Sequence, residues 1–231
     1  MTQPRIRSTT AVRALLAKEL RIELRTFETL PAMALFAVTT FVLFHFALDR
    51  GSVDGDLAAG VLWVTLLFAA MLGINRLFVA DEQDRGFDAF LLAPVERNTL
   101  LVAKAIALLG YLVVLEVVAV PAFTILLLGP SLSNALPELL VVLVLADLGI
   151  AVCGTLVAAL AVRTRARDLI GPLVALPLLL PVLIGGARAT TPLFLASGGH
   201  SFSLRWLAVL GLYDLVFGLL AYAVFDFLLE D

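Results

Sequence analysis

The sequence predicts an all-α membrane protein with six transmembrane helices and an amphipathic helix before the first of them. Of its 231 residues, 61 % are hydrophobic and 15 % are charged, whereas soluble domains carry about 25 % charged residues. The mean hydropathy is +1.05. The apolar residues also gather in six long runs with few charges, and a helix needs about 20 such residues to cross a hydrocarbon layer of ~30 Å.

The six predicted spans form one transmembrane domain, residues 31–231, after a cytoplasmic N-terminus of residues 1–30. They cover roughly residues 31–48, 57–76, 99–128, 137–162, 169–187 and 205–227. The third run is long, and Pro121 predicts a kink or a tilted outer end. The first run is not followed by a small-residue cleavage site, so we expect it to remain as a helix.

The positive charges predict the topology. Residues 1–30, 76–104 and 163–167 together hold 13 of the 16 lysines and arginines. The other connections hold only Arg50 and Arg188, with Arg205 at the start of the last span. Because cytoplasmic loops carry the excess of Lys and Arg, both termini and the connection 77–98 are expected in the cytoplasm.

Residues 10–30 have the pattern of a basic amphipathic helix. One side carries Val12, Leu15, Leu16, Leu20, Leu24 and Phe27, and the other carries mainly Arg13, Lys18, Arg21, Arg25 and Glu28. Such a helix is expected to lie among the lipid headgroups, held by apolar burial and by anionic lipid. A simple membrane anchor would have the same pattern.

The connection between the second and third spans, residues 76–94, has the pattern of a short amphipathic helix. Phe87, Phe90 and Leu91 share one face at spacings i, i+3 and i+4, and Pro94 ends the helix. The other faces carry the acidic residues Asp81, Glu82, Asp84 and Asp88. Because a plain connection needs only a few polar residues, the aromatic face predicts a docking site for another protein.

Several kinds of chemistry are absent from the sequence. It contains no G-x-x-x-x-G-K-[ST], and neither lysine follows a glycine, so any ATP must be bound by a partner. It has no H-E-x-x-H, no G-x-S-x-G and no His or Cys cluster, and Cys153 is the only cysteine. We therefore expect no catalytic residues, no metal site, no covalently bound cofactor and no nucleic-acid partner.

Three acidic residues fall inside predicted spans: Glu116, Asp147 and Asp214. An unpaired charge at that depth costs several kcal/mol, so such residues are candidate functional groups. Asp147 and Asp214 each lie about 10 residues, or ~15 Å, from the outer end of their span, which would allow them to face one cavity. Protonated acids packed against neighbouring donors are the alternative, and both interpretations stay open.

Several short motifs of this sequence also occur together in a known family. They are Arg76-Leu77-Phe78, Asp81, Gln83-Asp84, Leu91-Leu92, Pro94, Ala103-Lys104, Leu176-Pro177-Leu178, Pro181-Val182-Leu183-Ile184 and the stretch from Lys18-Glu19-Leu20 to Arg25. With these motifs the chain resembles the cytochrome c maturation protein B family, the membrane subunit of an ABC complex described as a haem exporter. The likeness covers nearly the whole chain. One departure is Arg85, which holds the place of a family glycine and shifts the turn to Gly86.

The resemblance implies two functional segments. Residues 77–98 would hold a coupling helix that docks on an ATPase, through Arg76, Asp81, Gln83, Asp84, Gly86, Phe87, Asp88, Phe90, Leu91 and Pro94. The N-terminal amphipathic helix would be an elbow helix with Lys18, Glu19, Arg21 and Arg25.

The resemblance also implies partners and a compartment. The ATPase would be maturation protein A, in a two-plus-two arrangement with a second copy of this chain. Further partners would be the haem-handling proteins C and D and the haem chaperone E, in the bacterial inner membrane. Haem would be the cargo, or ATP hydrolysis would release the haem-loaded chaperone. His45 and His200, both near the outer surface, are weak candidates for haem ligation because lone histidines near helix ends are usually interfacial.

Three other functions remain possible on the sequence alone. A permease of the same ABC-2 class that exports a lipid-linked glycan or a drug would share the elbow helix, the coupling segment and the six spans. A secondary transporter or intramembrane enzyme would use Asp147 and Asp214 without an ATPase. A structural scaffold would only hold the haem-handling subunit.

Overall fold

A computed structural model describes residues 8–48, 52–79, 81, 98–128, 135–162, 167–195 and 203–228. The elements of these residues are α1 (Ser8–Thr26), α2 (Thr29–Ala47), α3 (Gly55–Arg76), α6 (Asn98–Phe123), the π-helical turn η1 (Thr124–Leu128), α7 (Leu136–Val162), α8 (Arg167–Thr190), the 3-10 turn η3 (Thr191–Phe194) and α9 (Leu204–Leu228). The described part of the chain contains no strand. The predicted all-α class is therefore confirmed.

Six of the helices are long and apolar enough to cross a membrane. Five predicted spans, all but the fifth, begin and end within two residues of the helices. In the third span, α6 passes through Pro121 and continues as the π-helical turn η1. The predicted irregularity near Pro121 thus takes the form of a widened last turn, and the span stays in one piece.

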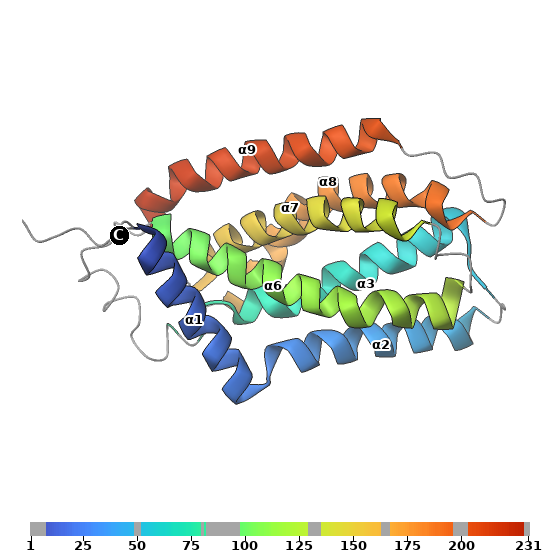
Figure 1. Ribbon diagram of the computed structural model, residues 1–231, viewed down its shortest axis with the longest axis horizontal. Coiled ribbons are helices and arrows are strands. Elements are labelled where there is room, and N and C mark those ends of the chain that lie inside the picture. The colour runs from blue at the N-terminus through green and yellow to red at the C-terminus, as the bar shows by residue number, and fades with distance from the viewer. Residues whose placement is uncertain are drawn as a thin grey trace, which may run out of the picture.

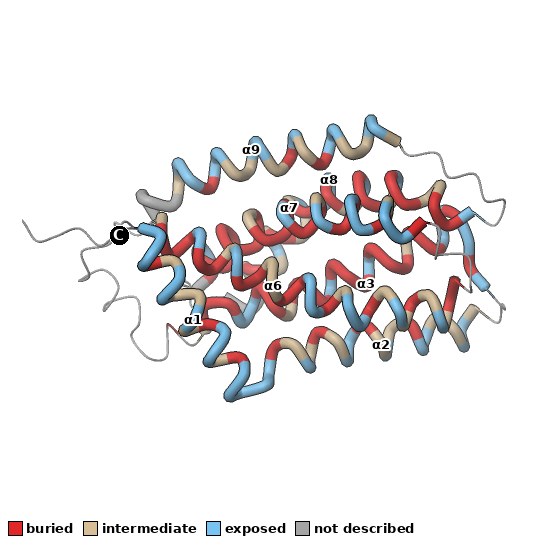
Figure 2. The backbone as a smooth tube through the Cα atoms, viewed as in Figure 1, coloured by how far each residue is buried: buried red, intermediate tan, exposed pale blue. Residues whose placement is uncertain are grey.

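The six long helices form a bundle in which α3 and α7 are the most buried, while α2 and α9 lie on the outside (Figures 1 and 2). The remaining helix, α1, runs obliquely across one end of the bundle and packs on α6 (Figure 1). By the predicted topology this is the cytoplasmic end.

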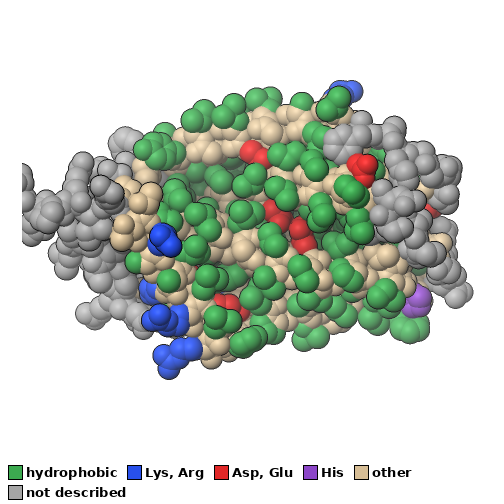
Figure 3. Space-filling model, in the orientation of Figure 1, with side chains coloured by type: hydrophobic (Ala, Val, Ile, Leu, Met, Phe, Trp, Pro, Cys, Tyr) green, Lys and Arg blue, Asp and Glu red, His purple; other side chains and the backbone are tan. Residues whose placement is uncertain are grey.

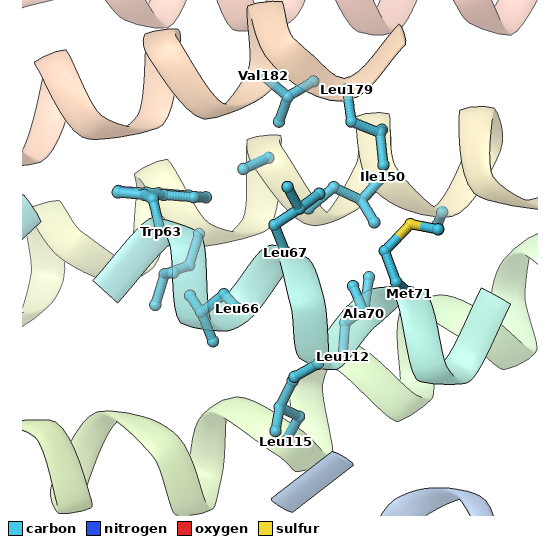
Figure 4. Packing of buried hydrophobic residues seen from close by; sticks show 14 of the residues in the cluster. Trp63, Leu66, Leu67, Ala70, Met71, Leu112, Leu115, Ile150, Leu179 and Val182 are labelled. Atoms are coloured by element: carbon cyan, nitrogen blue, oxygen red, sulfur yellow. The ribbon is translucent and has the colours of Figure 1, made fainter. Parts of the chain in front are cut away.

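The centre of the bundle is built around α3. Its residues Trp63, Leu66 and Leu67 lie between α6 on one side and α7 and α8 on the other (Figure 4). Trp63 and Leu62 are 2 % and 0 % exposed. Lipid tails are as apolar as these side chains, so the hydrophobic effect does not drive helices together inside a membrane. Close van der Waals packing between the helices stabilises the centre of the bundle instead.

The fifth span is longer than predicted, and a glycine pair explains why. The predicted fifth span covers residues 169–187. Instead α8 continues through Gly185 and Gly186 to Thr190, and η3 follows it to Phe194. A Cβ atom on Gly186 would lie 2.5 Å from Cζ2 of Trp63. The pair therefore permits close packing and does not end the helix.

A hydrogen bond supports this packing. Nε1 of Trp63 donates to Oγ1 of Thr190 over 3.0 Å, and Thr190 is fully buried. Earlier in α8, which is continuous through three prolines, the hydroxyl of Tyr213 donates to the carbonyl oxygen of Leu178 over 3.0 Å. These two bonds join α8 to α3 and to α9.

We predict that Gly186→Ala destabilises the protein by about 1 to 3 kcal/mol, because the new methyl group overpacks the Trp63 ring. Thermal unfolding of the purified protein in detergent measures this. The matched control is Gly60→Ala in α3, where an added Cβ meets no atom within 4 Å. The control should be neutral or stabilising. Equal stability of the two variants would contradict the close approach.

Candidate functional site

Four charged side chains meet where α1, the start of α6 and the chain after α3 come together. They are Lys18, Glu19, Asp81 and Lys104, and we call them the charge cluster. Glu19, Asp81 and Lys104 are buried, with Lys104 only 1 % exposed, and Lys18 is half-buried. Buried charges of this kind persist only when they are paired and hydrogen-bonded.

Lys104 is the centre of the cluster. Its Nζ lies 2.8 Å from Oε1 of Glu19, pairs with Oδ2 of Asp81 and donates to the carbonyl oxygen of Leu77 over 2.7 Å. One hydrogen bond and two ion pairs thus surround the ammonium group. The Phe78 ring adds a cation–π contact, with its centroid 4.9 Å from Nζ.

Asp81 joins both lysines of the cluster. Nζ of Lys18 donates to its Oδ1 over 2.6 Å, while Oδ2 pairs with Lys104. Burial alone raises the pKa of Asp81, but the ammonium groups of Lys104 and Lys18 lower it by more, so the pKa lies below the ordinary 3.8. The ionised Asp81 thus connects the chain after α3 to α1 and to α6.

Glu23 lies one turn after Glu19 on the same face of α1 and fixes the start of α2. Its Oε1 accepts hydrogen bonds from the backbone N–H groups of Thr29, over 3.0 Å, and Leu30, over 2.8 Å. These donors belong to the first turn of a helix and have no partner within it. Between the two helices the chain turns at Phe27, whose φ of 49° is left-handed. The acidic face of α1 therefore holds both α6 and α2.

This arrangement determines which face of α1 is exposed. Glu19 and Glu23 point into the protein, whereas Leu20, Leu24 and Phe27 are 44 %, 67 % and 62 % exposed. Arg21 and Arg25, the other elbow candidates, are exposed and lie outside the charge cluster. These three side chains are free to contact lipid, whereas Leu15, on the predicted apolar side, packs against the core of the bundle. The position of α1 among the headgroups remains a prediction.

Two of the ten predicted coupling residues belong to the described part of the chain. Asp81 is in the charge cluster, and Arg76 forms an exposed ion pair with Glu28 over 2.8 Å. The other predicted residues, Gln83, Asp84, Gly86, Phe87, Asp88, Phe90, Leu91 and Pro94, lie outside the described residues. Asp81 directly precedes them in the chain, so the charge cluster lies at the beginning of the predicted coupling segment.

Sequence reasoning gave Lys104 and Glu23 too little weight. Lys104 entered only as part of the Ala103-Lys104 motif, and Glu23 not at all. A lysine within an apolar run was the available signal, because such a residue needs an acidic partner. The i, i+4 spacing of Glu19 and Glu23 on α1 was the matching signal.

The intramembrane acids divide between two helix interfaces. The carboxyl group of Glu116 in α6 lies near that of Asp147 in α7. Asp214 lies against Gly149, where an added Cβ would be 2.7 Å from its Oδ1. Figure 3 shows acidic side chains near the middle of an otherwise apolar face formed by α6, α7 and α9. The structure therefore joins Asp147 to Glu116 and places Asp214 at the contact of α7 and α9.

Of the two histidines, the structure describes only His45. Nδ1 of His45 donates to the carbonyl oxygen of Leu126 in η1 over 2.5 Å, and the side chain is half-buried. His200 lies outside the described residues. Within the described ranges, no three His, Cys, Asp or Glu side chains lie close enough together to hold a metal ion.

We predict that Lys104→Met lowers the free energy of unfolding by about 3 to 5 kcal/mol, because it leaves Glu19 and Asp81 with one buried partner fewer. Chemical unfolding in detergent measures the change. Arg76→Met is the control, since it removes an exposed ion pair worth about 0 to 1 kcal/mol. A Lys104 variant no less stable than the Arg76 variant would contradict the cluster.

The pKa of Asp81 predicts a pH dependence. Because this pKa lies below 3.8 in the folded protein, ionised Asp81 stabilises the fold fully above that pH, and the effect is lost as the pH falls through the folded-state pKa. The stability gap between the wild type and Asp81→Asn should therefore be constant near neutral pH and shrink in acid. Unfolding measured over a pH series checks this, and a gap that persists in acid would contradict it.

Comparison with known proteins identifies the family. The family model described as CcmB protein matches residues 10–226. Heme exporter protein B of Rhodobacter capsulatus is 33 % identical over 178 residues, which cover 77 % of this chain and 81 % of the relative. Heme exporter protein B of Bradyrhizobium diazoefficiens is 31 % identical over 228 residues, covering 90 % and 94 %. The protein of the same name from Pseudomonas aeruginosa is 32 % identical over 85 % and 87 %. The chain therefore belongs to the CcmB protein family.

Proposed function

We propose that this protein is the membrane subunit of an ABC-type haem exporter that serves cytochrome c biogenesis. The relatives that it matches along most of their length are named heme exporter protein B. The six membrane-spanning helices suit a permease subunit, and the sequence has no P-loop. A chain of this kind takes its energy from a separate ATPase and carries out no catalysis of its own.

The ATPase would dock on the coupling segment that follows Asp81. In this proposal Phe87, Phe90 and Leu91 insert into a groove of the ATPase, while the acidic residues Asp84 and Asp88 face its basic rim. The pattern i, i+3, i+4 supports this, because it puts the three apolar side chains on one face of a helix.

The observation that carries the coupling proposal is the buried position of Lys104. A movement of the docked segment would reach Asp81 first, and Asp81 is paired with Lys104 of α6 and Lys18 of α1. Breaking these pairs would leave buried charges without partners, so the elements should move together. Through Glu23, which caps α2, the movement would extend to the first span.

The remaining partners follow from the family resemblance. The ATPase would be maturation protein A, bound in a two-plus-two complex with a second copy of this chain, and proteins C, D and E would handle haem. The protein would be a multi-pass protein of the bacterial inner membrane with both termini in the cytoplasm. The cargo step is either haem export or release of the haem-loaded chaperone.

We predict that Phe87→Asp and Phe90→Asp abolish co-purification of the ATPase and lower the yield of cytochrome c. A charge on the docking face would have to be buried in an apolar groove, which is unfavourable. Phe87→Leu and Phe90→Leu are the matched controls and should keep both properties. Unchanged binding and yield in the aspartate variants would rule out this docking mode.

Haem absorbance separates the two cargo steps. The intact complex is purified from membranes with its chaperone, and bound haem is measured before and after ATP is added. Haem that leaves together with the chaperone supports chaperone release, whereas haem that leaves this subunit without the chaperone supports export. The proposal of a haem-linked ABC subunit fails if the purified complex contains neither haem nor the ATPase.

A further inference from the structure

A groove runs between α6 and α9 on the face shown in Figure 3. Two adjoining cavities form it. The first, about 460 Å³, lies between the start of α1, the start of α6 and α9. The second, about 260 Å³, lies deeper, between α6, α7 and α9. Val102 and Tyr222 line both cavities, so the two meet at these side chains.

The length of the groove matches one leaflet of a bilayer. Along α6 it extends from Thr99 in the first cavity to Leu109 in the second. Ten helical residues rise ~15 Å, and half of a ~30 Å hydrocarbon core is the same length. By the predicted topology, the groove reaches from the cytoplasmic membrane surface to the middle of the membrane.

The chemistry of the groove changes along its length. The surface end carries the hydroxyl groups of Ser8, Thr9 and Thr99 and the guanidinium group of Arg13. Arg13 is exposed, and none of the ion pairs between described residues involves it. The side chains at the deep end are apolar except for the Tyr222 hydroxyl. This order suits an amphiphile with an anionic head and a hydrocarbon tail.

A glycine of α9 faces the deep end of the groove. Gly218 lines the second cavity, and a Cβ atom added to it would meet no atom within 4 Å. A larger side chain at this position would therefore enter the open space of the cavity.

We propose that this groove binds one anionic phospholipid of the cytoplasmic leaflet. Arg13 and the nearby hydroxyl groups hold the headgroup, and one acyl chain lies between α6, α7 and α9. The cytoplasmic leaflet is the one that is rich in anionic lipid, and the positive charge of Arg13 would attract such a headgroup. The lipid joins α1, whose position depends on the charge cluster, to α6 and α9.

Native mass spectrometry of the full-length, delipidated protein tests the headgroup contact. The protein is titrated with phosphatidylglycerol and, separately, with phosphatidylcholine. The wild type should bind phosphatidylglycerol more tightly, and Arg13→Gln should lower that affinity about fivefold, the effect of one cation near an anionic surface. Equal affinity for the two lipids in the wild type, or an unchanged preference in Arg13→Gln, would overturn the proposal.

A pair of glycine variants tests the position of the acyl chain. Gly218→Leu fills the deep end and should remove binding of both lipids. Gly211→Leu is the matched control on the same helix, because its added Cβ also meets no atom within 4 Å and it does not line the groove. Equal lipid binding by the two variants would overturn the proposal. So would a wild-type spectrum in which a second copy of the chain replaces the lipid.

Discussion

The end of the bundle that α1 crosses depends on one buried ammonium group, that of Lys104. A charge removed from water must be paired, and Lys104 finds Glu19, Asp81 and the Leu77 carbonyl oxygen as partners. This requirement turns Glu19 and Glu23 of α1 toward the bundle and leaves the neighbouring apolar side chains Leu20 and Leu24 exposed. It also holds Asp81 at a defined place where the predicted coupling segment begins.

The pairing of Lys104 also affects how α1 contacts lipid and how it could transmit movement. Because the acidic face is used for contacts with α6 and α2, the apolar side chains Leu20, Leu24 and Phe27 are left exposed. A helix held in this way can contact lipid on one side and transmit movement on the other. The proposed phospholipid beside Arg13 would add a third attachment, between α1 and the α6–α9 groove.

Much of the fold could be predicted from the sequence, because lipid forces every span to be a long apolar helix. The end of α8 could not, since the space that Gly185 and Gly186 leave for Leu210 and Trp63 depends on helices distant in sequence. The contact of Glu116 with Asp147 likewise depends on how α6 and α7 are rotated. At the candidate site, motif matching found Lys18, Glu19 and Asp81, but the central role of Lys104 required the three-dimensional packing.

We propose that the charge cluster transmits the work of an ATPase to the membrane helices. The most direct test is the yield of cytochrome c in cells carrying Lys18→Gln, which breaks the half-buried bridge to Asp81 without isolating a buried charge. Membrane level and ATPase co-purification are measured in the same cells. The claim predicts a severalfold lower yield with normal level and normal ATPase binding. A wild-type yield in this variant would contradict it.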